Sequence, residues 1–341
     1  MAGGIGSRLW PASTPQQPKQ FIDMLGTGRS LIQLTVERFL PVCDPDHFWV
    51  VTSRHYVDLV RSQLPAVPPA QILAEPEPRN TAPCIAYACW KIAARVPDAH
   101  IVVTPADAIV RDPFLFGEVV GSALDFAAGG GRIVTIGISP DRPETGYGYI
   151  CAEGDAYGKV CPVQAFKEKP DLETARAYLA AGNYYWNAGI FVWTAATIMD
   201  QIRRYAPGIA GVMDRLAPSF YTEGEEAALE ALFPQCEKIS IDYAVMEKSP
   251  DIHVIAADFG WSDLGSWSAV RDHLPLDEAG NGRVGEHVRL QDCSGCIVHA
   301  PDGEQVAVEG LKDCIVAVRD GAVLVCRLSQ DQQVRQLSQG L

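Results

Sequence analysis

The sequence predicts an α/β fold with a doubly wound mixed sheet, Rossmann-like in type, and a small all-β module at its C-terminal end. Three observations indicate this architecture. Stretches with helical spacing alternate with short apolar stretches typical of buried strands. Polar or glycine-rich loops follow several of these strands, as they do along the ligand-binding edge of an open α/β sheet. From residue 281 onward, short apolar segments recur between Gly and Asp turns without helical spacing.

The expected elements alternate in chain order. Pro65 and Gly182 end the helices that precede them. We expect one domain over residues 1–270 and a β module over residues 281–341, for which a short β-helix is one fitting arrangement. Helices are expected over 31–39, 56–64, 84–94, 116–128, 171–181 and 195–235, and strands over 48–52, 71–74, 100–104, 132–138 and 163–166.

The composition is that of an acidic globular protein. Its 341 residues have a formal net charge of −14 at pH 7, and 48% of them are apolar. The negative charge opposes broad contact with nucleic acid, because binding a polyanion depends on a basic surface. No apolar run reaches membrane-spanning length and no charged-then-apolar leader is present, so we expect a cytoplasmic protein without membrane contact.

The ten cysteines are scattered, and Cys293 and Cys296 are the only close pair. In a reducing cytosol such residues are usually small buried hydrophobic side chains. A zinc site on Cys293, Cys296, Cys314 and Cys326 is the less favoured alternative, because zinc ribbons prefer two CxxC pairs.

The chain is organised around its start, Gly3-Gly4-Ile5-Gly6-Ser7-Arg8, which Lys19 follows closely. Glycines let the backbone turn its N–H groups into one concavity, and Arg8 and Lys19 add positive charge. The pattern indicates a phosphate cradle, and the alternative is a tight loop without a ligand. It is not a Walker A loop, which needs Gly-Lys-Ser/Thr, nor a dinucleotide fingerprint, because Arg8 replaces the third glycine.

Two predicted strands end in polar side chains that could bind a ligand. Asn80 and Thr81 follow the strand over 71–74 and either cap the next helix or contact a ligand there. Asp107 follows the strand over 100–104, where it either caps a turn or holds Mg²⁺ against phosphates.

Later motifs combine polar side chains with glycine and aromatic residues. The stretch 145–150, Thr-Gly-Tyr-Gly-Tyr-Ile, indicates a bent strand, and its glycines would let a sugar ring approach the backbone. Glu168 and Lys169 form a neighbouring pair of the kind that is usually solvated and of little energy. Asn187, between aromatic residues and a glycine, suits a buried amide that binds a polyol. Asp242 is expected to cap a helix.

These motifs resemble those of a known family. Gly-Gly-x-Gly-x-Arg-Leu followed by Pro18-Lys19 is similar to the signature of the sugar-1-phosphate nucleotidylyltransferases. Within that family, Arg-Leu-Trp-Pro with Pro-Lys-Gln-Phe resembles the mannose-1-phosphate guanylyltransferases. The resemblance extends in order to about Trp267. The family places an apolar strand before the glycine loop, so we expect the natural start to lie upstream of Met1. Many relatives continue into an isomerase domain, so a chain ending at Leu341 is expected to lack isomerase activity.

The resemblance implies a nucleotidyltransferase-type fold and a role for each matching residue. The glycine loop would wrap the nucleoside triphosphate, and the catalytic cations would steady the phosphates. The implied residues are Arg8, Lys19 and Lys169 as catalytic, Gly3, Gly4, Gly6, Ser7, Asn80 and Thr81 for the nucleotide, Gly146, Tyr147, Glu168 and Asn187 for the sugar, and Asp107 and Asp263 for Mg²⁺.

The implied reaction joins GTP and α-D-mannose 1-phosphate into GDP-mannose, with release of diphosphate. One alternative is another pair of substrates, glucose 1-phosphate with dTTP or UTP. A second is a subunit that binds a nucleotide sugar without catalysis. The apolar β segments also favour a homo-oligomer.

Overall fold

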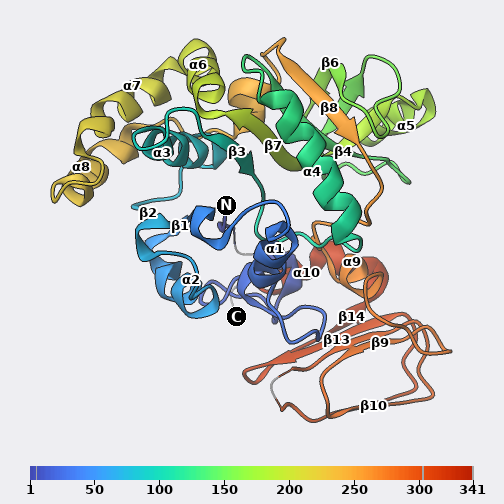
Figure 1. The fold of residues 1–341 in the computed structure, drawn as a ribbon. Helices are drawn as coiled ribbons and strands as arrows, with labels where there is room; N and C mark the ends of the chain where they lie inside the picture. Colours follow the sequence, from blue (N-terminus) through green and yellow to red (C-terminus); the bar gives the residue numbers. More distant parts are fainter. Residues whose placement is uncertain (5, 302, 340–341) are drawn as a thin grey trace. The chain divides into compact units, whose positions relative to one another are not determined.

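The computed structural model describes residues 1–4, 6–301 and 303–339, so Ile5 of the glycine loop and residues 302, 340 and 341 of the predicted β module lie outside the described residues. The chain forms two compact units (Figure 1). Unit 1 comprises Met1–Gly3, Arg38–Pro105 and Val110–Trp261, and unit 2 comprises Gly4–Glu37, Ala106–Ile109 and Ser262–Leu341. The division expected at residues 270 and 281 remains a prediction. Among the described residues, no helix has the length and apolar character to cross a membrane.

Unit 1 is built on a six-stranded mixed sheet with the order β3-β7-β4-β8-β6-β5. β4 and β8 run parallel, while β7 is antiparallel to both β3 and β4. The predicted mixed α/β sheet is therefore confirmed, although neither β7 nor β8 was expected from the sequence. The strands are β3 (His100–Val103), β4 (Ile133–Ile138), β5 (Tyr149–Ala152), β6 (Cys161–Lys167), β7 (Tyr184–Thr194) and β8 (Ile252–Ala256).

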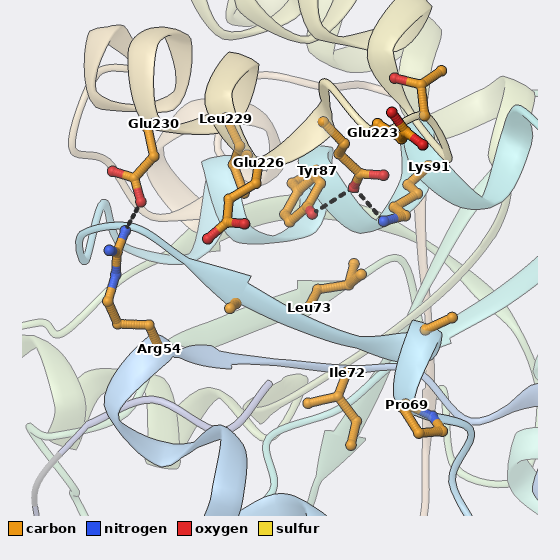
Figure 2. Close-up of a pocket in the computed structure, with 14 residues that line it drawn as sticks. Arg54, Pro69, Ile72, Leu73, Tyr87, Lys91, Glu223, Glu226, Leu229 and Glu230 are labelled. Atoms are coloured by element: carbon orange, nitrogen blue, oxygen red, sulfur yellow. Dashed lines mark hydrogen bonds and ion pairs between the residues drawn. The ribbon is translucent and has the colours of Figure 1, made fainter.

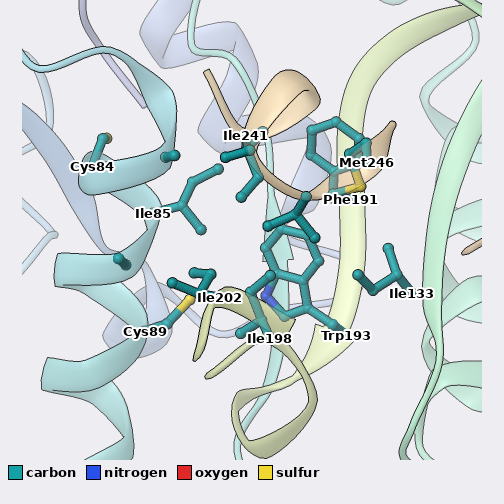
Figure 3. Close-up of a cluster of buried hydrophobic side chains, with 14 of the residues drawn as sticks. Cys84, Ile85, Cys89, Ile133, Phe191, Trp193, Ile198, Ile202, Ile241 and Met246 are labelled. Atoms are coloured by element: carbon teal, nitrogen blue, oxygen red, sulfur yellow. The ribbon is translucent and has the colours of Figure 1, made fainter. Parts of the chain in front are cut away.

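The sheet has an apolar core on each face, because successive side chains of a strand point to opposite sides. In β7, Phe191 and Trp193 belong to one buried cluster and Val192 belongs to the other. Figure 3 shows Phe191 and Trp193 among Ile85 of α3 and Ile198 of α6. Strands with both faces covered read as continuous apolar runs, which is why β4 was recognisable from sequence.

Helices supply the cover on both faces. Residues of α3, α6 and α7 contribute to one cluster, and residues of α4 and α5 contribute to the other. The helices are α1 (Leu31–Phe39), α2 (Val57–Gln63), α3 (Thr81–Ala93), α4 (Pro113–Ala127), α5 (Leu172–Ala181), α6 (Ala195–Tyr205), α7 (Pro207–Leu216), α8 (Glu225–Leu232), α9 (Trp267–Arg271) and α10 (Val334–Leu337).

Two further strands of unit 1 form a small parallel sheet, β1 (Val50–Ser53) with β2 (Ile72–Glu75). Ala2 pairs with Thr52 of β1 in parallel, and its N–H donates to the Val51 carbonyl at 2.9 Å. The first residues of the chain therefore take part in strand pairing immediately before the glycine loop.

Unit 2 contains a short β-helix. β9 (Gly282–Val284), β11 (Ile297–His299) and β13 (Cys314–Arg319) stack in parallel on one face, and β10 (Val288–Gln291) and β12 (Val306–Glu309) stack in parallel on a second. β14 (Ala322–Arg327) then turns back against β13. The turn uses Asp320 and Gly321, both at positive φ, as tight hairpin turns require. The expected all-β module is thus a β-helix closed by one hairpin.

The module's cysteines do not form a zinc site. Among the described residues, no group of three or more His, Cys, Asp or Glu side chains could hold a metal ion. The Cys293 thiol donates to the Gln291 carbonyl at 3.2 Å, and the Cys296 thiol donates to the Leu311 carbonyl at 3.4 Å. These thiols act as small interior groups, as the favoured interpretation expected.

Candidate active site

Most of the predicted site residues fall into two groups, one in each unit. The first group, in unit 2, begins with the glycine loop. Gly4 and Gly6 both have positive φ, at 98° and 67°. Gly6 caps a 3-10 helix over Ser7–Leu9, and a Cβ at Gly6 would lie 3.0 Å from Cγ and Cδ of Lys19. The loop therefore needs glycine both for its backbone angle and for its close approach to Lys19.

Lys19 is the buried cation of this group. It begins the 3-10 helix Lys19–Phe21 directly after Pro18, and only 7% of it is exposed. Its ammonium Nζ lies 3.0 Å from Oδ2 of Asp107 and donates to the backbone carbonyl of Asp263 at 2.6 Å. A buried charge is stable only when it is paired, so these two contacts account for its position. Arg8, in contrast, is exposed.

Asp107 and Asp263 are held near each other by an antiparallel bridge between their segments. Ile109 and Ser262 exchange backbone hydrogen bonds of 2.8 and 3.1 Å. Oδ1 of Asp263 accepts a hydrogen bond from the Gly265 N–H at 3.0 Å, and a Cβ at Gly265 would lie 2.7 Å from Oδ2 of Asp263. Both carboxylates thus belong to short turns fixed by the bridge. Their hard oxygens, beside a lysine, are the donors that Mg²⁺ prefers when it also binds phosphates.

Buried tryptophan contacts support the same turns. Trp267 is fully buried, begins α9 four residues after Asp263, and donates from its indole Nε1 to the backbone carbonyl of Trp10 at 3.3 Å. This bond ties the segment that carries Asp263 to the segment that carries Arg8.

The second group lies in unit 1 around Asn187 of β7. Its backbone N–H donates to the Gly148 carbonyl at 2.8 Å, and its side-chain Nδ2 donates to Oδ1 of Asp242 at 3.1 Å. Its Oδ1 accepts from the Thr135 hydroxyl at 3.3 Å. A Cβ at Gly148 would collide with the Glu168 carboxylate. Asn187, Gly148, Glu168 and Asp242 therefore form one polar cluster.

Three ionisable side chains of this second group lie close enough to affect one another. Glu168 is 10% exposed at its side chain and forms an ion pair with Lys169, which is 60% exposed. Burial, with a smaller effect of the nearby Glu168 charge, raises the pKa of Asp242 to about 6. Burial lowers the pKa of Lys169, but the hydrogen bond and charge of Glu168 outweigh that effect, so its pKa is raised overall.

Sequence reasoning missed two members of the second group. Gly148, rather than Gly146, is the glycine that lies against Glu168 and Asn187. Gly146 donates instead to Glu144 at 2.9 Å, and the Tyr147 ring meets the rings of Trp186 and Trp261 edge to face. Asp242 begins a short π-helix, Asp242–Met246, so the expected helix start is correct. The cap position is Ile241, however, and the Asp242 side chain binds the Asn187 amide instead. The alternation of glycine and aromatic residues in 145–150 was the available signal for Gly148.

Asn80 and Thr81 make structural hydrogen bonds at the start of α3. The Asn80 side chain accepts from the Thr81 N–H at 2.9 Å, which is the capping contact that the sequence left open. The Thr81 hydroxyl accepts from the Ile241 N–H at 2.9 Å, next to Asp242. Their contact with a nucleotide remains a prediction. Gly3, the last residue of the first segment of unit 1, is exposed.

A separate pocket of unit 1 contains none of the predicted site residues (Figure 2). It lies beside β2 and α8, where Glu225 accepts from Tyr87 at 3.2 Å and pairs with Lys91, and Arg54 pairs with Glu230. Both of its cations, Arg54 and Lys91, are therefore paired with glutamates of the same unit.

Comparisons with known proteins cover nearly the whole chain. Residues 1–279 match the family model described as Nucleotidyl transferase, and residues 285–341 match the model of a MannoseP isomerase/GMP-like beta-helix domain. A xanthan biosynthesis protein of Xanthomonas campestris, XanB, is 38% identical over 339 residues, covering 99% of this chain and 71% of the relative. A mannose-1-phosphate guanylyltransferase of Escherichia coli is 36% identical over 343 residues, covering 98% and 71%.

Among solved structures, a protein from Thermus thermophilus described as a mannose-1-phosphate geranyltransferase aligns with a TM-score of 0.89 and 33% identity. The alignment covers 99% of this chain and 96% of that protein. The predicted family resemblance, the fold and the β-helical end are thereby confirmed.

Proposed function

This chain belongs to the nucleotidyl transferase family, and we propose that it transfers GMP from GTP to α-D-mannose 1-phosphate, giving GDP-mannose and diphosphate. The supporting observation in the structure is the first group, in which a glycine loop lies on the stem of a buried lysine and that lysine meets two aspartate segments. Residues 1–270 serve in this proposal as the catalytic domain.

The proposed chemistry is an in-line displacement at the α-phosphorus of GTP. A phosphate oxygen of mannose 1-phosphate forms the new P–O bond, and the bond to the diphosphate leaving group breaks. Such a transfer depends on positioning and charge neutralisation more than on a protein nucleophile. Backbone N–H groups of the glycine loop, with Arg8 and Lys19, would bind the triphosphate and offset charge on the departing diphosphate.

Asp107 and Asp263 would hold Mg²⁺, because two carboxylates beside a phosphate-binding lysine offer only hard oxygen donors. When bound, the ion would neutralise phosphate charge. The charge-assisted contact with Lys19 would hold the Asp107 carboxylate in place.

The second group would bind the sugar phosphate. Glu168, Asn187 and Asp242 offer acceptors and donors suited to sugar hydroxyl groups, and the exposed ammonium of Lys169 suits the phosphate. The lack of a side chain at Gly148 lets the Glu168 carboxylate lie close to Asn187.

A substrate panel tests the proposal. Purified chain is mixed with Mg²⁺, one of GTP, ATP, dTTP or UTP, and one of mannose, glucose or galactose 1-phosphate, and released diphosphate is measured. We expect GTP with mannose 1-phosphate to react fastest. Preference for dTTP or UTP with glucose 1-phosphate would support the other substrate pair. If no pair of substrates gave diphosphate release, the result would support a subunit that binds a nucleotide sugar without catalysis.

We also propose that the chain forms a homo-oligomer through the outer edge of the β-helix. Val323 and Val325 of β14 are 57% and 59% exposed, an unusual surface for a strand at the end of a sheet. Light scattering of the purified chain, with Val325→Lys as the variant, tests this: a smaller particle for the variant supports it, and a monomer in both samples refutes it. A cytoplasmic location remains a prediction.

A further inference from the structure

The β-helix of unit 2 contacts the segment that joins the two phosphate-binding elements. Residues 10–18 connect the turn that carries Arg8 to the turn that carries Lys19. Arg319, at the end of β13, is 9% exposed and donates from Nη1 to the Ala12 carbonyl at 2.6 Å. Its Nη2 donates to Oε1 of Gln17. One guanidinium thus binds the connecting segment at two places.

Gln17 connects Arg319 to the turn that carries Lys19. The same Gln17 side chain donates from Nε2 to the Phe21 carbonyl at 3.5 Å, at the end of the Lys19–Phe21 turn. Thr14 and Gln17 also close a turn of their own, because the Thr14 N–H donates to the Gln17 carbonyl at 3.2 Å and the Gln17 N–H donates to the Thr14 hydroxyl at 3.2 Å. The path from Arg319 to the Lys19 turn is therefore a continuous series of hydrogen bonds.

Apolar packing adds to this connection. Leu9 and Ala12 are buried in the same cluster as Ile315 and Ala317 of β13 and Val334 of α10. The inner face of the β-helix and the phosphate-binding segments therefore share one core. A segment anchored this way loses little freedom when a nucleotide binds.

We propose that Arg319 is a positioning residue for nucleoside triphosphate binding, acting through Ala12 and Gln17 on the elements that carry Arg8 and Lys19. The proposal rests on the proposed function. It also gives the β-helix a part in the reaction, because its own Arg319 fixes the geometry of the first group, within the same unit. The planar guanidinium fork holds its two N–H donors in a fixed geometry, so it satisfies both acceptors at once.

The test compares Arg319→Gln with Arg319→Lys and with Arg289→Gln, a change at an exposed arginine of the same β-helix. KM for GTP, KM for mannose 1-phosphate, kcat and thermal unfolding are measured for each. We expect Arg319→Gln to raise KM for GTP about tenfold or more, with KM for mannose 1-phosphate within about twofold. Arg319→Lys should recover part of the loss, and Arg289→Gln should match the unsubstituted chain.

Gln17→Ala keeps the proposal testable if Arg319→Gln does not fold. It should raise KM for GTP in the same direction, whereas Gln16→Ala, at an exposed neighbour, should not. In the double variant, the effects of Gln17→Ala and Arg319→Gln should be less than additive, because both remove the same connection.

The outcomes separate this inference from the proposed function. Unchanged KM for GTP in both Arg319→Gln and Gln17→Ala, or equal rises in KM for both substrates, would overturn the positioning role. If the unsubstituted chain released no diphosphate, the proposed function would fail. Calorimetric binding of GTP with Mg²⁺ would then still test Arg319, since a tenfold weaker binding in Arg319→Gln supports the role and equal binding refutes it.

Discussion

Replacing Asp107 by asparagine distinguishes its contribution to the stability of the fold from its contribution to catalysis. Lys19 Nζ lies 3.0 Å from Asp107 Oδ2 and also donates to the Asp263 carbonyl at 2.6 Å. In Asp107→Asn the amide oxygen still accepts a hydrogen bond from Lys19, and the Asp263 contact is unaffected. The carboxylate is 28% exposed, so solvent already weakens the ion pair. We expect a loss of about 1 to 2 kcal/mol in free energy of unfolding, or a few degrees in Tm.

Turnover should respond far more strongly. Asp107→Asn removes a charged Mg²⁺ ligand and leaves Lys19 without its counter-ion, so we expect kcat/KM to fall at least about 10³-fold, equivalent to about 4 kcal/mol. The assay is diphosphate release with GTP and mannose 1-phosphate, with thermal unfolding on the same samples. Asp98→Asn, which makes the same charge change at an exposed position, is the control. Activity of Asp107→Asn within about tenfold of the unsubstituted chain would refute the metal-ligand role.

Further predictions concern the second group and the glycine loop. Gly148→Ala places a methyl group against Glu168, so KM for mannose 1-phosphate should rise about tenfold while KM for GTP stays within about twofold. Steady-state kinetics with each substrate varied in turn measures both values. A larger rise in KM for GTP than in KM for mannose 1-phosphate would contradict the prediction. Because the pKa of Asp242 is raised to about 6, its ionisation costs the folded state free energy as pH rises from 4 to 7. Asp242→Asn should therefore gain about 1 to 2 kcal/mol in unfolding free energy relative to the unsubstituted chain over that range. Denaturant titrations at pH 4 and 7 measure it, and a pH-independent difference would show that Asp242 is not strained by burial. Gly6→Ala, at φ 67° and against the Lys19 stem, should weaken GTP binding about tenfold, with Gly208→Ala, whose added methyl group would have no atom within 4 Å, as the calorimetry control.

Much of the fold follows from local pattern. Buried strands such as β4 read as unbroken apolar runs, and helix ends such as Gly182 carry their own backbone signal at positive φ. β8 was missed because a half-buried histidine interrupts the short apolar run of Ile252–Ala256. Its place between β4 and β6 depends on long-range pairing, which a local pattern does not reveal.

The sequence motifs identified most of the site residues, but they did not reveal which of these residues contact one another. Lys19 and Asp107 were each recognised from a motif. Their ion pair joins residues 88 positions apart in the sequence, and only the fold brings them together. Asp242 was assigned to a helix start, which is correct, while its bond to Asn187 needed the pairing of β7 with its neighbours. Arg319 had no motif at all, because its two acceptors lie about three hundred residues earlier in the chain.

The most direct test of the central claim follows the α-phosphate itself. The purified chain is incubated with Mg²⁺, mannose 1-phosphate and GTP labelled at the α-phosphorus, and the labelled products are separated. The account predicts that the label appears in GDP-mannose only when mannose 1-phosphate is present, with one diphosphate released for each molecule formed. Label that remains in GTP, or that appears as GMP or GDP regardless of the sugar phosphate, would contradict it.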